Sequence, residues 1–310
     1  MRSAALWTIC ARRREIETAL GGDVAKVVRG FFAAFVVALV TALVAPPPSA
    51  AAGTVVNGIP IVGKTYTTWK AAGGTATFGL PEAARVSATI GRRTARLQRF
   101  AKGQVFYSTL GKQTFLYPST LRLSGINNER DALARYGFAP GMLLRTAALS
   151  KATKLDKLKL TTELKGGVII DLRTSSAIKL APDPKLPGVN RYNFPIDPNG
   201  SYANFVTDPV RREAFAKTLK TAAASHGTVL IHCALGRDRT GWAVAMLMYV
   251  LGADDGQVQS EYLRTSTASA GTLKVGLDQV ATSYGSVDNY LRAGLGLTDA
   301  DFAALKAKFS

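Results

Sequence analysis

Hydrophobic and polar positions alternate along residues 119–310 in a pattern that predicts strands and helices in turn. Residues 166–174 (GGVIIDLRT) and 228–232 (TVLIH) contain short apolar runs of the kind found in buried parallel strands. Residues 154–165 carry leucines at helical spacing, and residues 208–224 begin with an Asp-Pro pair that is typical of a helix start. This order of elements predicts an α/β fold in which a parallel sheet is flanked by helices.

Residues 53–118 follow a different pattern. Residues that favour strands are separated by glycine turns, and no helical period is visible, so we expect a small separate β-rich module. The stretches FGLP at 78–81 and RLQRFAKGQVFYS at 96–108 resemble one LGFP-type repeat. That resemblance implies attachment to a bacterial cell wall. The alternative is a β-rich extension with no binding role.

The beginning of the chain has the features of a signal peptide. An uncharged, mainly apolar run at 31–45 follows Lys26 and Arg29, and the small residues at 49–52 offer a cleavage site. We therefore expect residues 1–52 to be a leader and the protein to be secreted or held at the cell surface. An uncleaved N-terminal anchor is the alternative, and it would be the protein's contact with a membrane.

Charge and composition limit the classes of partner and cofactor that we expect. The 310 residues include 39 Lys and Arg against 21 Asp and Glu, a formal net charge of +18. This charge favours anionic partners such as wall polymers, phospholipid head groups or phosphorylated substrates. Nucleic acid is not expected, since no dense basic run or aromatic platform accompanies the charge. Two cysteines and two histidines exclude a disulfide framework and make a zinc site improbable, so neither metal nor cofactor is expected.

Candidate chemistry is concentrated in residues 232–241 (HCALGRDRTG), between a predicted strand and a predicted helix. Such a loop can turn successive backbone N–H groups inward, and the helix dipole adds to its attraction for phosphate. Positive surroundings favour the thiolate of Cys233, which could then attack phosphorus. The guanidinium of Arg239 can donate two parallel hydrogen bonds to phosphate oxygens. The expected phosphate cradle consists of Ala234, Leu235, Gly236, Arg237, Asp238 and Arg239.

Four further residues receive expected roles around this loop. The hydroxyl of Thr240 could donate to the sulfur and ease its departure during hydrolysis. Asp238 either orients Arg237 and a water molecule or caps the following helix. We expect His232 to fix the loop by hydrogen bonds and to support the thiolate, and Asp171 to pair with Arg173 or a backbone amide as a structural acid.

The segment HCALGRDRTG is similar to the HCxxGKDRTG signature loop of the atypical bacterial protein tyrosine and lipid phosphatases, a group within the cysteine-dependent tyrosine phosphatases. Other features of that group recur in order at 128–131 (NERD), 141–153 (GMLLRTAALSKAT) and 284–309. The sequence departs from the group at Arg237, where lysine is usual, and at Glu129, where an aromatic residue is usual. The first departure puts the gripping of a second phosphate, and with it lipid phosphatase activity, in doubt.

A general acid is needed upstream of the loop to protonate the leaving group. Asp197, in FPIDPNG, is the best candidate, and by resemblance it occupies the position of the acid. The alternative is a turn aspartate. Because only 35 residues separate Asp197 from Cys233, there is little room for an inserted lid, and we expect an open site.

These features predict an exported cysteine-dependent phosphatase that hydrolyses phosphate monoesters, most plausibly phosphotyrosine in proteins. Phosphoinositides and inositol phosphates are alternative substrates for the same mechanism. A rhodanese-like sulfurtransferase is the rival enzyme, although its loop is shorter and lacks the Arg-Thr-Gly ending. A cell-wall or phospholigand-binding protein without catalytic activity is the alternative from another class.

Overall fold

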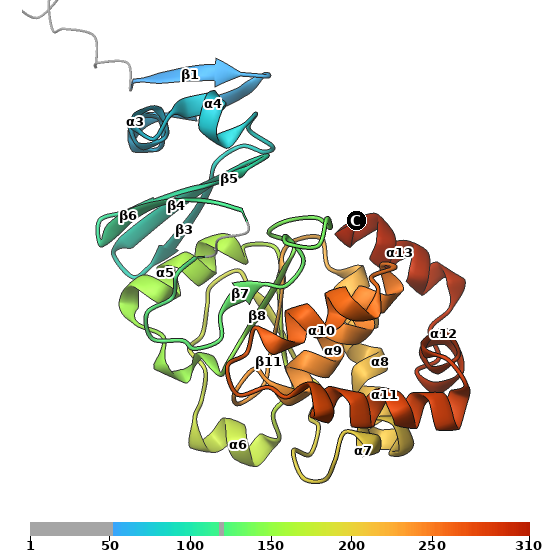
Figure 1. The fold of residues 1–310 in the computed structure, drawn as a ribbon. Coiled ribbons are helices and arrows are strands. Elements are labelled where there is room, and N and C mark those ends of the chain that lie inside the picture. Colours follow the sequence, from blue (N-terminus) through green and yellow to red (C-terminus); the bar gives the residue numbers. More distant parts are fainter. Residues whose placement is uncertain (1–51, 118–120) are drawn as a thin grey trace, which may run out of the picture. The chain divides into compact units, whose positions relative to one another are not determined.

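The structure is a computed structural model that describes residues 52–117 and 121–310 (Figure 1). The predicted leader, apart from its last residue, lies outside the described residues, as does the predicted boundary between residues 118 and 119. Within the two described ranges, no helix is long and apolar enough to cross a membrane.

A five-stranded sheet forms the centre of the predicted catalytic segment. Its strands lie in the order β10 (Asn190–Asn193), β9 (Val168–Asp171), β11 (Val229–His232), β8 (Leu143–Thr146) and β7 (Arg130–Asp131). The first four strands are parallel, as predicted, whereas the two-residue β7 runs antiparallel to β8 at the edge. All residues of β8, β9 and β11 are buried, and each strand begins with consecutive apolar residues, as is typical of parallel strands covered on both faces.

Helices cover this sheet, and two of them were predicted closely. The helix expected at 154–165 is α5 (Lys154–Glu163), which begins with a capping box between Thr153 and Asp156. The helix expected after Asp208 is α8 (Pro209–Ala224), and the Asp208 side chain accepts a hydrogen bond from the Val210 amide. The remaining elements of this segment are η1 (Leu149–Lys151), α6 (Ser175–Leu180), α7 (Ala203–Thr207), α9 (Asp238–Val250), α10 (Asp255–Leu263), α11 (Ala270–Tyr284), α12 (Val287–Asn289), the π-helix η2 (Tyr290–Gly294) and α13 (Asp299–Phe309).

Alternate residues of the central strands pack into two different cores. Val229 and Ile231 of β11 join the core that α8 and α9 build on one face. Leu230, between them, joins a second core with Leu158 of α5. This alternation shows that the sheet is covered on both faces, as the predicted fold class requires.

The β-rich segment at 52–117 contains two helices that the sequence pattern did not predict. Its elements are β1 (Gly53–Val56), β2 (Ile59–Val62), α3 (Gly63–Ala71), α4 (Gly74–Phe78), β3 (Val86–Ile90), β4 (Arg93–Phe100), β5 (Gly103–Ser108) and β6 (Gly111–Leu116). The last four strands form an antiparallel meander. Thr65 and Trp69, one turn apart on α3, are buried, and the Trp69 ring stacks on Phe100 with centroids 6.1 Å apart. Tertiary packing therefore stabilises a helix whose glycine and threonine content disfavours it.

This β-rich segment shares a core with the predicted catalytic segment. Leu97 and Phe106 of its sheet are buried in the same cluster as Leu158 of α5. The Arg99 guanidinium donates hydrogen bonds of 2.6 Å to the Glu163 carboxylate and 2.6 Å to the Thr228 hydroxyl. Residues 52–310 consequently pack as one compact unit rather than as two independent bodies.

Candidate active site

The loop that joins β11 to α9 carries the predicted signature residues, and its backbone makes a turn at Gly236 that only glycine allows. Gly236 has a φ of +65°, and a Cβ atom there would lie 2.2 Å from the carbonyl oxygen of Thr146. Both the backbone conformation and the lack of space require glycine. After this turn α9 begins at Asp238, and most of its residues are buried, which anchors the end of the loop in the core.

A group of side chains, which we call the clamp, contacts the carbonyl groups of the loop. The clamp consists of Arg130, Arg145, Glu261 and Asn128. Arg145 of β8 donates from Nη2 to the Gly236 carbonyl at 2.6 Å and from Nη1 to Glu261 of α10 at 2.5 Å. Arg130 of β7 donates from Nε to the other Glu261 oxygen at 2.6 Å. Asn128 donates to the Gly236 carbonyl at 2.8 Å. The clamp therefore fixes the loop's backbone through permanently charged groups.

The backbone N–H groups of the loop remain available for a ligand. Within the described chain, the N–H groups of residues 234–239 donate to no other group of the protein. Unpaired N–H groups beside a helix N-terminus are an anion-binding arrangement. The structure thus brings together the six residues predicted to form the phosphate cradle.

Arg239 joins the cradle to two other segments. Its Nη1 atom donates to the carbonyl oxygens of Leu172 and Ile196, both at 3.1 Å, and its side chain is buried. Asp197 follows Ile196 directly and is exposed, and its carboxylate accepts the Asn199 amide at 2.9 Å. Asp197 therefore forms a turn next to the segment that Arg239 contacts. Its role as general acid stays a prediction.

Cys233 is buried, with 2% of its surface exposed, and belongs to the main core cluster. The expectation of an open site is wrong for this thiol, because the loop itself and the core beneath it cover the sulfur without an inserted lid. Thr240 is also fully buried, and its hydroxyl has no hydrogen-bond partner within the described residues. An unpartnered buried hydroxyl is free to donate to a group formed during a reaction.

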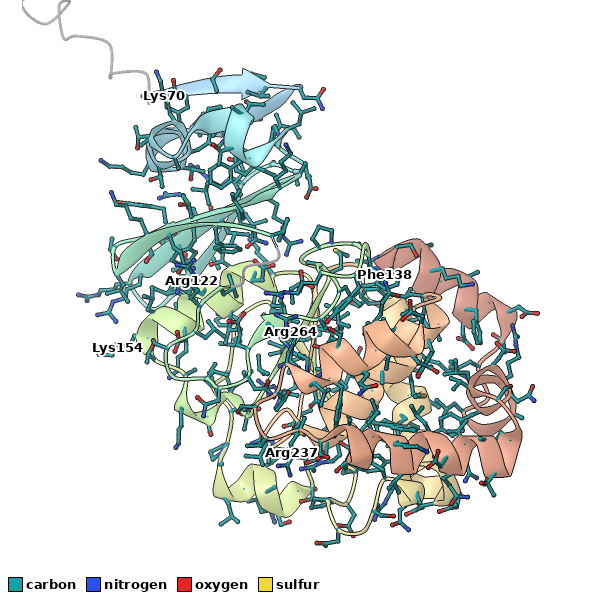
Figure 2. All side chains as sticks on the ribbon, viewed as in Figure 1. Lys70, Arg122, Phe138, Lys154, Arg237 and Arg264 are labelled. Atoms are coloured by element: carbon teal, nitrogen blue, oxygen red, sulfur yellow. The ribbon has the colours of Figure 1, made fainter. Side chains whose placement is uncertain are left out.

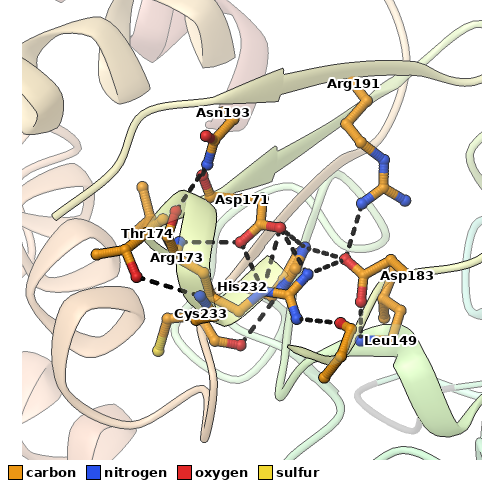
Figure 3. A network of polar contacts seen from close by, with 12 residues as sticks. Leu149, Asp171, Arg173, Thr174, Asp183, Arg191, Asn193, His232 and Cys233 are labelled. Carbon is orange, nitrogen blue, oxygen red and sulfur yellow. Dashed lines mark hydrogen bonds and ion pairs between the residues drawn. The ribbon is translucent and has the colours of Figure 1, made fainter. Parts of the chain in front are cut away.

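His232 lies in a network of charged side chains next to the nucleophile (Figure 3). Arg173 donates three hydrogen bonds of 2.7–3.1 Å to Asp171 and one of 2.7 Å to Asp183. Arg191 donates to Asp183 at 2.7 Å, and the Nε2 atom of His232 lies 3.2 Å from the same carboxylate. Burial alone would raise the pKa of Asp183, but His232, Arg173 and Arg191 lower it to about 2. Asp171 is thus placed as a structural acid paired with Arg173, as expected.

The side chains of Asp171, Asp183 and His232 are the one group in the described chain whose composition suits a metal ion, with ligand atoms within 4.8 Å of one another. A metal ion does not fit these residues, because the positively charged Arg173 and Arg191 already bind the two carboxylates. A divalent cation there would have to displace buried guanidinium groups. We assign no metal to these residues.

A cavity of about 510 Å³ lies beside the cradle at Arg237 and Asp238. Arg237 lies near the start of α11 (Figure 2), and Ser269, Gly271 and Val275 of that region line the same cavity. Thr272 of α11 also lines the cavity. The remaining lining residues come from the segment at 198–205 and are Pro198, Gly200, Ser201, Tyr202 and Phe205. The cavity therefore adjoins both the cradle and the segment that follows Asp197.

Asp238 holds Arg237 in place. Both Asp238 oxygens accept from the Arg237 Nε atom at 3.0 Å, and one also accepts from the Tyr202 hydroxyl at 3.1 Å. The Tyr202 and Tyr262 hydroxyls are 2.7 Å apart. Arg237, and not Asp238, occupies the N-cap position of α9. The geometry matches the first expected role of Asp238, which was to orient Arg237.

Comparison with known families shows the family to which the chain belongs. Residues 121–275 and 266–310 match the family described as "Tyrosine phosphatase family". The chain belongs to the tyrosine phosphatase family. The prediction of a tyrosine-phosphatase-like chain is confirmed at the level of this family, which covers the segment that carries the signature loop.

The individual proteins compared with this tyrosine phosphatase family member are 31%, 19% and 16% identical to it. A Cupriavidus necator protein named "Putative tyrosine-protein phosphatase" is 31% identical over 130 residues, which cover 33% of this chain and 46% of that protein. The match thus spans about half the length of that relative. Among solved structures, the catalytic core of a PP-IP phosphatase from S. cerevisiae is 19% identical, with a TM-score of 0.34, and covers 51% of this chain and 90% of its own. A kinase associated phosphatase is 16% identical, with a TM-score of 0.29, and covers 50% and 88%.

The structure adds site residues that sequence analysis missed in this phosphatase family member. Asp183 lies 3.2 Å from the Nε2 atom of His232, and Glu261 joins the two arginines of the clamp. Asp183 lies in an irregular segment after α6, where the sequence shows only a turn-like PDP. Glu261 is a single acid on a helix, and its burial, which is unusual for an acid, becomes visible only in the structure.

Proposed function

We propose that this protein is an exported cysteine-dependent phosphatase that hydrolyses phosphate monoesters, with phosphotyrosine in proteins as its preferred substrate. The observation that carries the proposal is the signature loop, in which the N–H groups of residues 234–239 are unpaired within the described chain, directly after Cys233, and the Arg239 side chain is buried. Membership of the tyrosine phosphatase family supports the same reaction class.

The reaction follows from the groups that the loop brings together. The Cys233 thiolate attacks phosphorus while the bond from phosphorus to the leaving oxygen breaks, and Asp197 supplies a proton to that oxygen. The cradle N–H groups and Arg239 stabilise the charge on the phosphoryl oxygens. Water then attacks the phosphocysteine, and the hydroxyl of Thr240 donates to the departing sulfur. No step requires a metal ion.

The cavity beside the cradle supports an aromatic leaving group. Tyr202, Phe205, Pro198 and Val275 give it apolar walls, on which a phenyl ring can pack. Arg237 supplies a cationic rim at the same cavity. A second phosphate on an inositol ring would find that cation, which keeps inositol phosphates and phosphoinositides as the second candidate substrates.

Export and wall attachment form the rest of the proposal. The signal-peptide pattern supports export. The β-rich segment supports binding to an anionic wall polymer through its charge, because residues 53–117 contain nine basic residues and one acidic residue. The basic residues are Lys64, Lys70, Arg85, Arg92, Arg93, Arg96, Arg99, Lys102 and Lys112, and the acid is Glu82. Arg99 is paired with Glu163, and Arg85 donates to the carbonyl oxygen of Val62.

The test is a hydrolysis panel with the full chain and EDTA present. The panel contains a phosphotyrosine peptide, a phosphoserine peptide, phosphoinositides and inositol hexakisphosphate, and Cys233→Ser is the matched control. We expect phosphate release that resists EDTA, is fastest from phosphotyrosine and disappears in the variant. Release that persists in Cys233→Ser would exclude the cysteine mechanism. A folded protein that binds phospholigands without releasing phosphate would favour the non-catalytic alternative, and turnover of thiosulfate would favour the sulfurtransferase.

A further inference from the structure

The turn that carries Asp197 is held by a buried arginine on each side of the acid in the chain. The carbonyl oxygen of Ile196, one residue before Asp197, accepts a hydrogen bond from Arg239 of the signature loop at 3.1 Å. The carbonyl oxygen of Asn199, two residues after Asp197, accepts one from Nη2 of Arg211 at 2.7 Å. The Asp197 carboxylate itself accepts the Asn199 amide at 2.9 Å. The position of this carboxylate therefore follows the position of the turn.

Arg211 belongs to α8, and its guanidinium is fixed by neighbours on both sides. The side chain is buried, and its Nε atom lies 3.1 Å from an oxygen of Asp208, the residue that caps the same helix. The guanidinium carbon lies 6.0 Å from the centre of the Phe205 ring. Phe215, one turn further along α8, is buried in the main core. An anchored helix thus presents a permanently charged donor to the Asn199 carbonyl.

Gly200 allows the turn to pack closely against the segment that precedes α8. Its φ is +93°, and a Cβ atom there would lie 2.5 Å from Oδ1 of Asn204 and 3.7 Å from Nη1 of Arg211. The same Asn204 oxygen accepts the Ser201 amide at 2.9 Å. The turn therefore has contacts on the side of α7 and α8 as well as on the side of the signature loop.

We infer that Arg211 is a positioning residue for Asp197, which it acts on through the turn. The inference rests on the proposed function in taking Asp197 as the general acid, whose proton passes to the leaving oxygen as the bond from that oxygen to phosphorus breaks. Pro198, Gly200 and Ser201 of the turn line the cavity beside the cradle, whereas Arg211 is not among its lining residues. Misplacement of a reacting group by about 1 Å can cost about a hundredfold in rate. Arg211 thus affects the reaction without contacting the substrate.

The leaving group of the substrate provides a test that a general loss of folded protein would not imitate. With the full chain, kcat/KM is measured for a phosphotyrosine peptide, whose leaving oxygen needs a proton, and for 2,4-dinitrophenyl phosphate, whose leaving group departs as an anion. In Arg211→Ala we expect kcat/KM to fall about tenfold to a hundredfold for the peptide and less than about threefold for the dinitrophenyl ester. An equal loss on both substrates would overturn the inference.

Arg212→Ala is the matched control, because it removes a neighbouring arginine of the same helix. Arg212 donates to the carbonyl oxygens of Gly294, Val206 and Thr207 at 2.8–3.2 Å, all outside the turn that carries Asp197. The ratio of the two kcat/KM values should stay at its wild-type value in this control. In an Asp197→Asn background, Arg211→Ala should change the ratio by less than about twofold, since no proton remains to be positioned. An undiminished change there would also contradict the inference.

Amide hydrogen exchange tests the contact itself and requires no phosphatase activity. We expect the amides within residues 196–201 to exchange about tenfold faster in Arg211→Ala than in the wild type or in Arg212→Ala, because the turn loses a hydrogen bond from a charged donor. Unchanged exchange would show that Arg211 does not hold the turn, and the inference would be wrong. If the wild type hydrolyses neither substrate, the proposed function fails, whereas the exchange rates still decide whether Arg211 holds the turn.

Discussion

The two ends of the signature loop are held by buried charges of different kinds. At the end that carries His232 and Cys233, the surrounding groups contact a titratable ring, and Asp183 is their centre. At the other end, Arg145 contacts a backbone carbonyl, and Glu261 is the centre. Arginine does not titrate in the physiological range, whereas histidine does. The first network therefore surrounds the ring next to the nucleophile, and the second sets the shape of the cradle.

Replacing the central acid of the second network gives the largest expected effect on stability. Glu261→Gln leaves the buried guanidinium groups of Arg130 and Arg145 without their counter-charge. Loss of one partner of a buried ion pair costs about 3–5 kcal/mol of unfolding free energy. Urea unfolding at pH 7 measures this cost. Glu213→Gln, in an exposed pair with Lys217, is the control and should change stability by about 0–1 kcal/mol. Equal effects of the two substitutions would show that Glu261 does not hold the clamp.

The first network gives a smaller effect that depends on pH. The folded-state pKa of Asp183 is about 2 against an ordinary value of 3.8, because His232, Arg173 and Arg191 outweigh the effect of burial. Its stabilisation is therefore complete above pH 3.8 and is lost as the pH falls towards 2, a change of about 2 kcal/mol. The difference in unfolding free energy between wild type and Asp183→Asn should shrink across this interval. A difference that stays constant with pH would mean that Asp183 does not titrate with the fold.

The smallest expected effect is on kcat/KM, and it comes from a change at Tyr202, which lines the cavity beside the loop. Burial raises the pKa of Tyr202 well above its ordinary value, so its hydroxyl stays a donor to Asp238. Tyr202→Phe removes two hydrogen bonds, one to Asp238 and one shared with Tyr262. A hydrogen bond is worth about 0.5–1.5 kcal/mol, and loss of the one that holds Asp238 should lower kcat/KM for a phosphotyrosine peptide about threefold to tenfold. Tyr249→Phe removes a hydrogen bond to Asp255 outside the site and should leave kcat/KM unchanged. A loss of the same size in both variants would assign the effect to stability.

Sequence patterns predicted the central elements because their determinants are local. The apolar runs of β9 and β11 and the cap of α8 are contained in a few neighbouring residues. The signature loop was also predicted from the sequence, since Gly236 and Arg239 belong to one loop and are close together in the chain. The loop consequently lies between β11 and α9, and Asp171 pairs with Arg173. The roles of the cradle residues stay a prediction.

The networks behind the loop depend on contacts between distant residues, which a single sequence does not reveal. Glu261 meets Arg130 across 131 positions, and Asp183 meets His232 from an irregular segment. The helix α3 was missed for a related reason, because packing of Trp69 against Phe100 outweighs its weak helix propensity. The burial of Cys233 also depends on the assembled core, and not on the length of chain available for a lid.

The central claim is that Cys233 forms a covalent phosphocysteine, and rapid quenching tests it directly. The full-length protein is mixed with excess phosphotyrosine peptide, quenched at times shorter than one turnover and digested for mass spectrometry. The account predicts a phosphate adduct on the peptide that contains Cys233, and none in Cys233→Ser. Phosphate release in the wild type with no adduct at any time, or with an adduct on another residue, would contradict the account.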